Sequence, residues 1–279
     1  MTHPTDISPL TRVVARLDRA SVGEVDPSLV PTRFPSIDRA IGGGFRRGDL
    51  IVVGGDDSAG CSALALAIAL RVSPRALLLT GEMHAERAYA RALAIEATVS
   101  LESLRLGAVS EEERARLATA AVTLRDRAPV IETITAGTLA AIEHAVEGTP
   151  DTPLVVVDPL ECLLDRDVGR DEALGYAVLS LKRLALRRNV AVLLTAHLPL
   201  LDRGRLDRRP RLADFGLGGA IGTHADLVLG LYREELYEAD LGVSGAAEVL
   251  LLKYRDGAKG YVDLYFDSRY SRFEDVLEE

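Results

Sequence analysis

The sequence predicts an α/β fold in which a mostly parallel β-sheet is flanked by helices and ends in an antiparallel hairpin. Apolar runs typical of buried strands alternate with longer segments of helical periodicity along most of the 279 residues. Continuous apolar runs, rather than alternating ones, are typical of parallel strands covered on both faces. The last two apolar runs are joined by a short segment that contains Asp256 and Gly257, which is typical of a hairpin turn.

The size and composition fit one such domain with a short extension. The chain is 48% hydrophobic and has two cysteines, which lie far apart in the sequence without metal-ligand spacing. No apolar run approaches the roughly 20 residues needed to cross a bilayer, and no charged and then apolar leader opens the chain. We therefore expect a cytoplasmic protein in a reducing compartment, without a membrane segment.

The net charge of −9 argues against a surface covered with nucleic-acid-binding charge. This net charge does not exclude a locally basic loop. Only three lysines occur, at positions 182, 253 and 259, so almost all positive charge is arginine.

Residues 1–30 are predicted to be an N-terminal extension, and residues 31–279 the main domain. Within the extension, apolar side chains at helical spacing predict a short amphipathic helix from Leu10 to Leu17. A helix this short docks its apolar face either on the main domain or on a neighbouring subunit. A second short helix is predicted to begin with Ser36 as its N-cap and to end at the glycines of positions 42–44.

The stretch from Asp49 to Leu70 predicts a strand, a glycine-rich loop and a helix. The loop has the spacing G-x-x-x-x-G-K-S/T of a phosphate-binding loop, except for one residue. In such a loop the glycines allow backbone N–H groups to face an anion, and the final hydroxyl is placed to touch Mg²⁺. The alternative is an ordinary glycine-rich turn of an α/β protein. The candidate nucleotide-binding residues are Gly55, Ser58, Gly60, Cys61 and Ser62.

Two departures from the pattern predict that this loop binds ATP poorly. Cys61 stands where the lysine that reaches the β- and γ-phosphates is expected. Asp56 and Asp57 place carboxylates where a triphosphate would have to come close, and like charges repel.

Acidic residues follow two of the later predicted strands. Glu82 comes just after the strand at residues 75–80, and Asp158 ends the strand at residues 153–158. An open parallel sheet presents its ligands at this end of its strands. Asp158 is either a Walker B acid that holds the Mg²⁺ shell or the chance end of a buried strand.

Helices are predicted within residues 84–128, where Ser110 and Glu113 form a capping box, and at residues 138–147 and 171–188. Further strands are predicted at residues 128–132, 189–195, 225–232, 247–253 and 260–266.

The segment at residues 201–219 is dense in arginine and glycine and has too few apolar residues for a packed element. It is either a solvated loop or a mobile basic loop that grips a phosphate backbone. Under the second interpretation the candidate DNA-binding residues are Arg203, Arg205, Arg208, Arg209 and Arg211.

In this order, the segments resemble the C-terminal motor domain of the DnaB-type replicative DNA helicases, a RecA-like P-loop NTPase fold. The resemblance covers roughly residues 30–275. It rests on the stretches PTRFPSIDRAIGGGFRRGDLIVVGG, LLLTGEMHAE, PLVVVDPLECL, VAVLLTAHL, RRPRLADFGLGGAIGTHADLVLGLYR and LLKYRDGAKGYVDLYF.

The resemblance implies a ring, usually of six subunits, with ATP and Mg²⁺ between neighbours and single-stranded DNA in the centre. It implies that Glu82 activates the attacking water and that Ser62 and Asp158 hold the metal. His197 stands at the position of a polar sensor, usually glutamine, for the γ-phosphate. Lys253 and Arg255 match a basic pair that reaches a neighbour's ATP.

The resemblance also implies other replication proteins as partners. We expect no counterpart of the family's N-terminal primase-contacting domain in this chain.

We therefore expect a ring-forming DnaB-like protein of DNA replication or related DNA metabolism whose ATP binding and hydrolysis are weak or lost. One alternative is an active ATP-dependent helicase or translocase with unusual phosphate contacts. Another is a non-catalytic scaffold or regulator that binds DNA or a partner. RadA-like and KaiC-like ATPases are a third option, although the KYRDG and GEMHAE stretches fit the DnaB type better.

Overall fold

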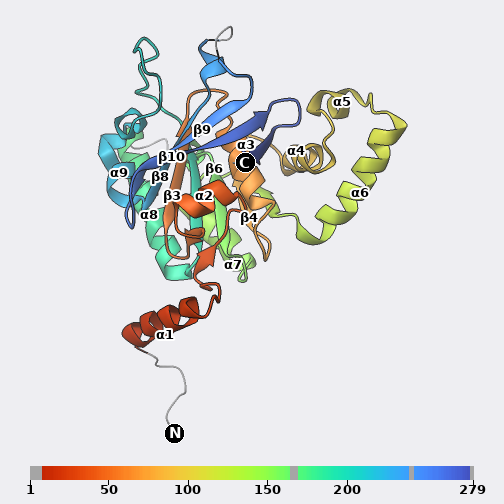
Figure 1. Cartoon of the computed structure of the whole chain (residues 1–279). Coiled ribbons are helices and arrows are strands. Elements are labelled where there is room, and N and C mark those ends of the chain that lie inside the picture. The colour runs from red at the N-terminus through yellow and green to blue at the C-terminus, as the bar shows by residue number, and fades with distance from the viewer. Residues whose placement is uncertain (1–7, 164–168, 239–241, 277–279) are drawn as a thin grey trace.

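The computed structural model describes residues 8–163, 169–238 and 242–276 (Figure 1). Residues 1–7 of the predicted N-terminal extension lie outside this part. The α-helices are α1 (Pro9–Ser21), α2 (Pro35–Ala40), α3 (Cys61–Ala69), α4 (Ala85–Ala97), α5 (Leu101–Leu106), α6 (Glu111–Arg127), α7 (Leu139–Gly148), α8 (Arg170–Arg188) and α9 (Ala220–His224).

The strands are β1 (Leu29–Val30), β2 (Phe45–Arg46), β3 (Leu50–Gly55), β4 (Leu77–Thr80), β5 (Val130–Thr133), β6 (Leu154–Asp158), β7 (Ala191–Ala196), β8 (Leu227–Tyr232), β9 (Ala246–Tyr254), β10 (Gly260–Asp267) and β11 (Arg272–Asp275).

One sheet of nine strands organises the described chain, in the order β11-β10-β9-β8-β3-β7-β6-β4-β5. The six strands from β8 to β5 run parallel, with Val52 of β3 paired to Leu194 of β7 and to Val228 of β8. Every residue of β3, β6, β7 and β8 is buried. The predicted parallel core is confirmed, because continuous apolar strands require cover on both faces.

Helices cover the two faces of this sheet. Alternate residues of β3 point to opposite sides, so that Ile51 and Val53 join the core cluster that contains α3. Leu50 and Val52 join the cluster that contains α7 and α8. The layer order is therefore helix, sheet, helix, and the carboxyl ends of the parallel strands open at one edge.

The antiparallel end of the sheet contains the predicted hairpin and one further strand. β9 pairs antiparallel with β10 and with β8, which confirms the hairpin. β11 adds to β10 through Phe266 and Phe273, whose ring centroids lie 4.4 Å apart. No pattern in the sequence indicated β11, or the two-stranded sheet of β1 and β2.

The segment between β4 and β5 folds into α4, α5 and α6, which project to one side of the sheet (Figure 1). The predicted capping box of α6 is confirmed: the Glu113 N–H donates to Ser110 Oγ over 3.2 Å, and the Ser110 N–H donates to Glu113 Oε2 over 2.8 Å. These bonds satisfy backbone N–H groups that have no partner within the helix.

The predicted N-cap of α2 was wrong. The helix begins at Pro35 with Phe34 as its N-cap, rather than with Ser36. Pro35 suits the first turn because its missing N–H has no helical partner there. The Asp38 carboxylate of this helix instead accepts from the N–H and hydroxyl of Thr32, both over 2.8 Å.

The predicted amphipathic helix is present as α1 and lies apart from the sheet (Figure 1). Its apolar residues are uncovered, with Leu10 73% and Leu17 61% exposed.

Of the helices in the described ranges, none combines the length and the apolar composition of a membrane span.

Candidate functional site

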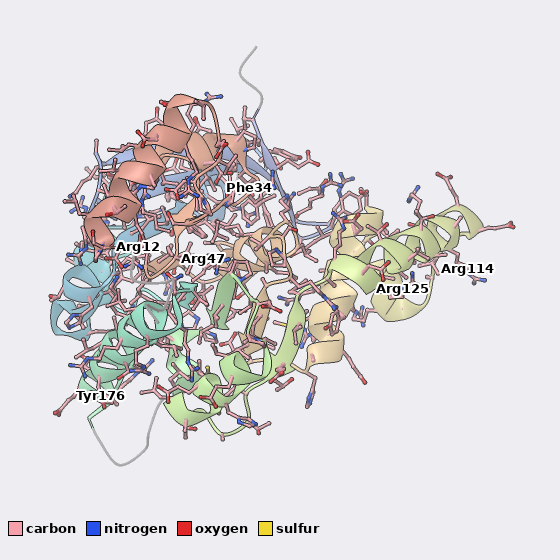
Figure 2. All side chains as sticks on the ribbon, turned by 90° about the horizontal axis from the view of Figure 1, so that it is seen from below. Arg12, Phe34, Arg47, Arg114, Arg125 and Tyr176 are labelled. Carbon is pink, nitrogen blue, oxygen red and sulfur yellow. The ribbon has the colours of Figure 1, made fainter. Side chains whose placement is uncertain are left out.

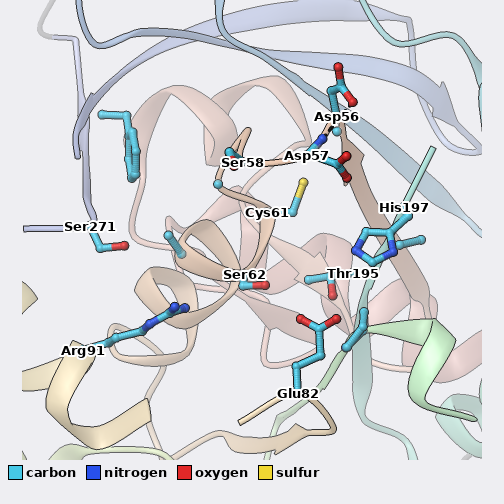
Figure 3. A pocket seen from close by; sticks show the side chains of 16 residues that line it. Asp56, Asp57, Ser58, Cys61, Ser62, Glu82, Arg91, Thr195, His197 and Ser271 are labelled. Carbon is cyan, nitrogen blue, oxygen red and sulfur yellow. Dashed lines mark hydrogen bonds between the residues drawn. The ribbon is translucent and has the colours of Figure 1, made fainter. Parts of the chain in front are cut away.

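A cavity of about 320 Å³ opens at the carboxyl end of β3, where the predicted phosphate loop turns into α3. Figure 3 shows the side chains around it. It is bordered by the loop, by residues that follow β4 and β7, and by the helix α4. The lining residues are Gly55, Asp56, Asp57, Ser58, Gly60, Cys61, Ser62, Ala63, Glu82, Arg91, Pro159, Thr195, Ala196, His197, Phe266 and Ser271.

The loop has the backbone of an anion cradle. Gly60 is the N-cap of α3 with a φ of 105°, and Ser58 also has a positive φ, of 65°. A side chain on Gly55 would come within 2.8 Å of the Leu231 carbonyl oxygen, so the close turn requires glycine there. No side chain caps the N-terminus of α3. Its first N–H groups and the helix dipole therefore favour an anion at this end.

Three side chains that carry oxygen atoms meet next to the loop. Ser62 Oγ and Thr195 Oγ1 both donate to Asp158 Oδ1, over 2.8 and 2.6 Å. Asp158 and Thr195 are buried, at the ends of neighbouring strands. Hydroxyl and carboxylate oxygens are suitable ligands for Mg²⁺, which usually keeps several waters and takes few protein ligands. Ser62 and Asp158, the predicted metal residues, are thus brought together.

Glu82 and His197 border the same cavity from two different strand ends. In Figure 3 the Glu82 carboxylate points toward Ser62 and Thr195, and the His197 ring lies above it. Glu161 contacts His197, the first residue after β7: Glu161 Oε1 accepts from the His197 backbone N–H over 3.1 Å. Its Oε2 lies 3.7 Å from His197 Nδ1. A carboxylate and an imidazole therefore face the space beside the predicted metal residues.

Cys61 is the first residue of α3, and its thiol faces the cavity (Figure 3). Burial, together with the nearby Asp158 charge, raises the pKa of the Cys61 thiol to about 12. The side chain is therefore neutral at physiological pH, and it supplies neither a cation nor a reactive thiolate.

Arg91 is a cavity residue that was not among the predicted site residues. It extends from α4 toward the cavity (Figure 3). Burial lowers the pKa of its guanidinium, and the Arg87 charge adds to this, although the group remains a cation. Among the described residues, no carboxylate forms an ion pair with it. The sequence did not single Arg91 out: it lies three residues after Ala88, but only the structure shows that Ala88 is buried on the inner face of the helix.

The two loop carboxylates contact the arginine-rich segment. Arg203 Nη2 donates to Asp56 Oδ1 and, over 2.9 Å, to Asp57 Oδ2. Asp56 also accepts from the Tyr237 hydroxyl over 2.9 Å. The hydrogen bond from Arg203 is the main cause that holds the pKa of Asp56 below its usual value.

The other candidate DNA-binding arginines also have partners within the chain. Arg205 donates to both carboxylate oxygens of Asp214, over 2.9 and 2.7 Å. Arg209 donates to both oxygens of Glu248, each over 2.6 Å. Arg208 lies over the Tyr237 ring, 5.1 Å from its centroid, and the Arg211 backbone N–H donates to Asp214. The segment is held by these contacts, which no pattern in the sequence indicated.

Lys253 and Arg255, which the resemblance assigns to a neighbour's ATP, have contacts within the chain. Lys253 Nζ donates to the carbonyl oxygens of Gly222, over 2.8 Å, and of Ala225. Arg255 Nε donates to Asp226 Oδ1 over 2.7 Å, and half of its side chain is exposed. They do not line the cavity of their own chain.

Curated relatives share the sequence over most of this chain. Replicative DNA helicase DnaB of Geobacillus stearothermophilus is 29% identical over 254 residues, which are 88% of this chain and 56% of that protein. Replicative DNA helicase DnaC of Bacillus subtilis (strain 168) is 28% identical over 258 residues, which are 89% of this chain and 57% of that protein. The chain thus spans a little over half the length of these relatives.

Solved structures share the fold. One is described as an ATPase domain and superposes with a TM-score of 0.89 at 22% identity, covering 98% of this chain and 100% of that one. A DnaB-like replicative helicase, described with its interactions with primase, gives a TM-score of 0.87 at 22% identity and covers 99% of this chain and 69% of that one. The family model of the DnaB-like helicase C terminal domain matches residues 30–275. The chain therefore belongs to the family of DnaB-like helicase C-terminal domains.

Proposed function

We propose that this chain is the RecA-like domain of a ring-forming DnaB-like protein of DNA replication whose ATP binding is weak and whose ATP hydrolysis is slow or lost. One observation carries the proposal: the cavity keeps its glycine cradle, its hydroxyl and its acids, but holds a neutral thiol where the phosphate-contacting lysine is expected. A missing cation removes direct stabilisation of the charge that develops in phosphoryl transfer.

The chemistry of the cavity supports ATP with Mg²⁺ as the ligand. Ser62 and Asp158 would hold the metal, and the N-terminus of α3 would receive the phosphates. The metal would neutralise phosphate charge. Glu82 and His197 line the same cavity. Glu82 would accept a proton from a water near Ser62 and Thr195, and His197 would donate or accept a hydrogen bond.

Assembly into a ring, with residues 1–30 as a linking extension, is part of the same proposal. The uncovered apolar face of α1 supports it, because such a face is stabilised by a partner surface. The Arg255 side chain is half exposed. In the ring it would leave Asp226 and bind a phosphate of the ATP held by the neighbouring subunit. We also propose that the ring binds single-stranded DNA and replication proteins such as primase. Its proposed location is the cytoplasm.

Arg91 is the first residue to test, because within the described chain it is a cavity cation without a carboxylate partner. Arg91→Ala is expected to weaken the binding of Mg²⁺-ATP about tenfold to a hundredfold, since a charge-assisted hydrogen bond contributes roughly 1.5 to 3 kcal/mol. Isothermal titration of the full chain with ATP and ADP measures this. Arg87→Ala removes the same charge from the same helix, outside the cavity lining, and should bind like the unmodified chain. Equal affinities for all three proteins would contradict the role of Arg91.

The position of Arg91 also favours one rival function, an active helicase or translocase in which this arginine replaces the lysine. Strand displacement that disappears in Glu82→Gln would select that rival. The scaffold alternative predicts DNA or partner binding that does not depend on ATP.

A further inference from the structure

The phosphate loop of this chain contains two carboxylates that would repel a polyphosphate. Asp56 and Asp57 both line the cavity, between the glycines that shape the loop. Left alone, they would add two negative charges beside the ligand's own. The structure places one guanidinium, that of Arg203, against both of them.

The contact between Arg203 and Asp56 is extensive and partly shielded from water. Arg203 Nε donates to Asp56 Oδ1 and Oδ2, over 3.1 and 3.0 Å, in addition to the bonds from Nη2. Asp56 is only 11% exposed, and the Tyr237 hydroxyl holds its second oxygen. A bidentate guanidinium contact on a mostly buried carboxylate is stronger than an ordinary surface ion pair.

Arg203 also remains accessible to a second anion. Its side chain is 61% exposed, and it belongs to the arginine-rich segment. Arg205 and Arg209 are bound to Asp214 and Glu248, which lie outside the phosphate loop. Of these three arginines, Arg203 is the one whose partners belong to the phosphate loop.

We propose that Arg203 determines the nucleotide affinity of the loop by compensating Asp56 and Asp57, and that a nucleic-acid backbone competes for it. This rests on the proposed function, since it assumes that the cavity takes a polyphosphate. With Arg203 in place, the single positive charge of its guanidinium offsets one of the two carboxylates. When a phosphodiester chain takes Arg203 away, both carboxylates are uncompensated and the loop rejects the polyphosphate.

The consequence is negative coupling between two ligands at separate sites. Nucleic acid bound to Arg203 weakens nucleotide binding, and nucleotide weakens nucleic-acid binding by the same factor, because coupling of equilibrium affinities is reciprocal. We expect a factor of about five, at the lower end of typical couplings, since water screens an exposed guanidinium.

The first experiment measures the Kd of N-methylanthraniloyl-ATP with Mg²⁺ by fluorescence for the full chain and its variants. Arg203→Gln should raise the Kd about fivefold, and Arg203→Lys, which keeps the charge, much less. Adding Asp56→Asn and Asp57→Asn to Arg203→Gln should restore the affinity, because the charges that needed compensation are gone.

Arg125→Gln is the matched control for this series. Arg125 also pairs with a neighbouring aspartate, is 71% exposed and projects from α6 (Figure 2). This variant should leave the Kd unchanged. A merely structural role of Arg203 predicts no rescue by the two asparagines, and that result would overturn the proposal.

The second experiment repeats the titration with a saturating single-stranded oligo(dT). The Kd for the nucleotide should rise about fivefold in the unmodified chain and stay constant in Arg203→Gln, which has no guanidinium for the oligonucleotide to bind. An unchanged Kd in the unmodified chain overturns the competition. If the proposed function is wrong, the fluorescence titration gives another result. No protein of the series then binds the nucleotide, and neither does Cys61→Lys.

Discussion

The Cys61→Lys variant is expected to bind Mg²⁺-ATP about tenfold to a hundredfold more tightly than the unmodified chain. The thiol at this position is neutral, since burial raises its pKa to about 12. An ammonium group at the same helix N-terminus would form charge-assisted hydrogen bonds with the phosphates, worth roughly 1.5 to 3 kcal/mol. Isothermal titration with ATP and ADP measures the gain, which should be larger for ATP.

Cys61→Met is the control for size, because it lengthens the side chain without adding charge. It should give no gain in affinity. If Cys61→Lys binds ATP no better than Cys61→Met, then the cavity lacks more than a cation, and the loop is not a damaged phosphate cradle.

The Asp226→Ala variant is expected to lose about 3 kcal/mol of its free energy of unfolding. Asp226 is 6% exposed and accepts from the Leu50 N–H over 2.9 Å, from Lys182 Nζ and from Arg255 Nε. These bonds join the first residue of β3 to α8 and to the end of β9. Removing one partner of a buried ion pair leaves the other charge uncompensated, which costs roughly 3 to 5 kcal/mol.

Urea unfolding followed by circular dichroism measures this loss. Asp256→Ala provides the comparison, because Asp256 is exposed and forms an ordinary surface ion pair. Its Oδ2 lies 3.8 Å from Arg46 Nε. Its free energy of unfolding should change by no more than about 0.5 kcal/mol. Equal unfolding midpoints for the two variants would show that Asp226 does not hold β3 in place.

The parallel core could be predicted from the sequence because its signal is local. The runs at residues 154–157 and 191–194 are continuous and apolar, and such runs form buried strands wherever two faces are covered. The spacing of the loop between β3 and α3 predicts a phosphate-binding loop, with an ordinary glycine-rich turn as the alternative. The short strands β1, β2 and β11 lack such a run. They form by pairing with a neighbouring strand, which their own sequences do not indicate.

The charge contacts of Arg203 and Arg209 could not be predicted, because they join residues that are distant in sequence. Arg203 and Asp56 are 147 positions apart, and Arg209 and Glu248 are 39 apart. In the sequence, the arginine-rich segment carries an excess of positive charge. In the fold, three of its guanidinium groups are bound to carboxylates of the same chain. The aspartates of the phosphate loop are likewise uncompensated in the sequence, and only the fold brings Arg203 beside them.

The central claim is that the site has the cradle and the acids of an ATPase but lacks the cation that efficient ATP hydrolysis requires. Steady-state ATP hydrolysis by the full chain, with and without single-stranded DNA, tests it most directly, and Glu82→Gln reports contaminating activity. We predict the same background rate for both proteins. Turnover at the rate of ordinary ring helicases that disappears in Glu82→Gln would contradict the claim.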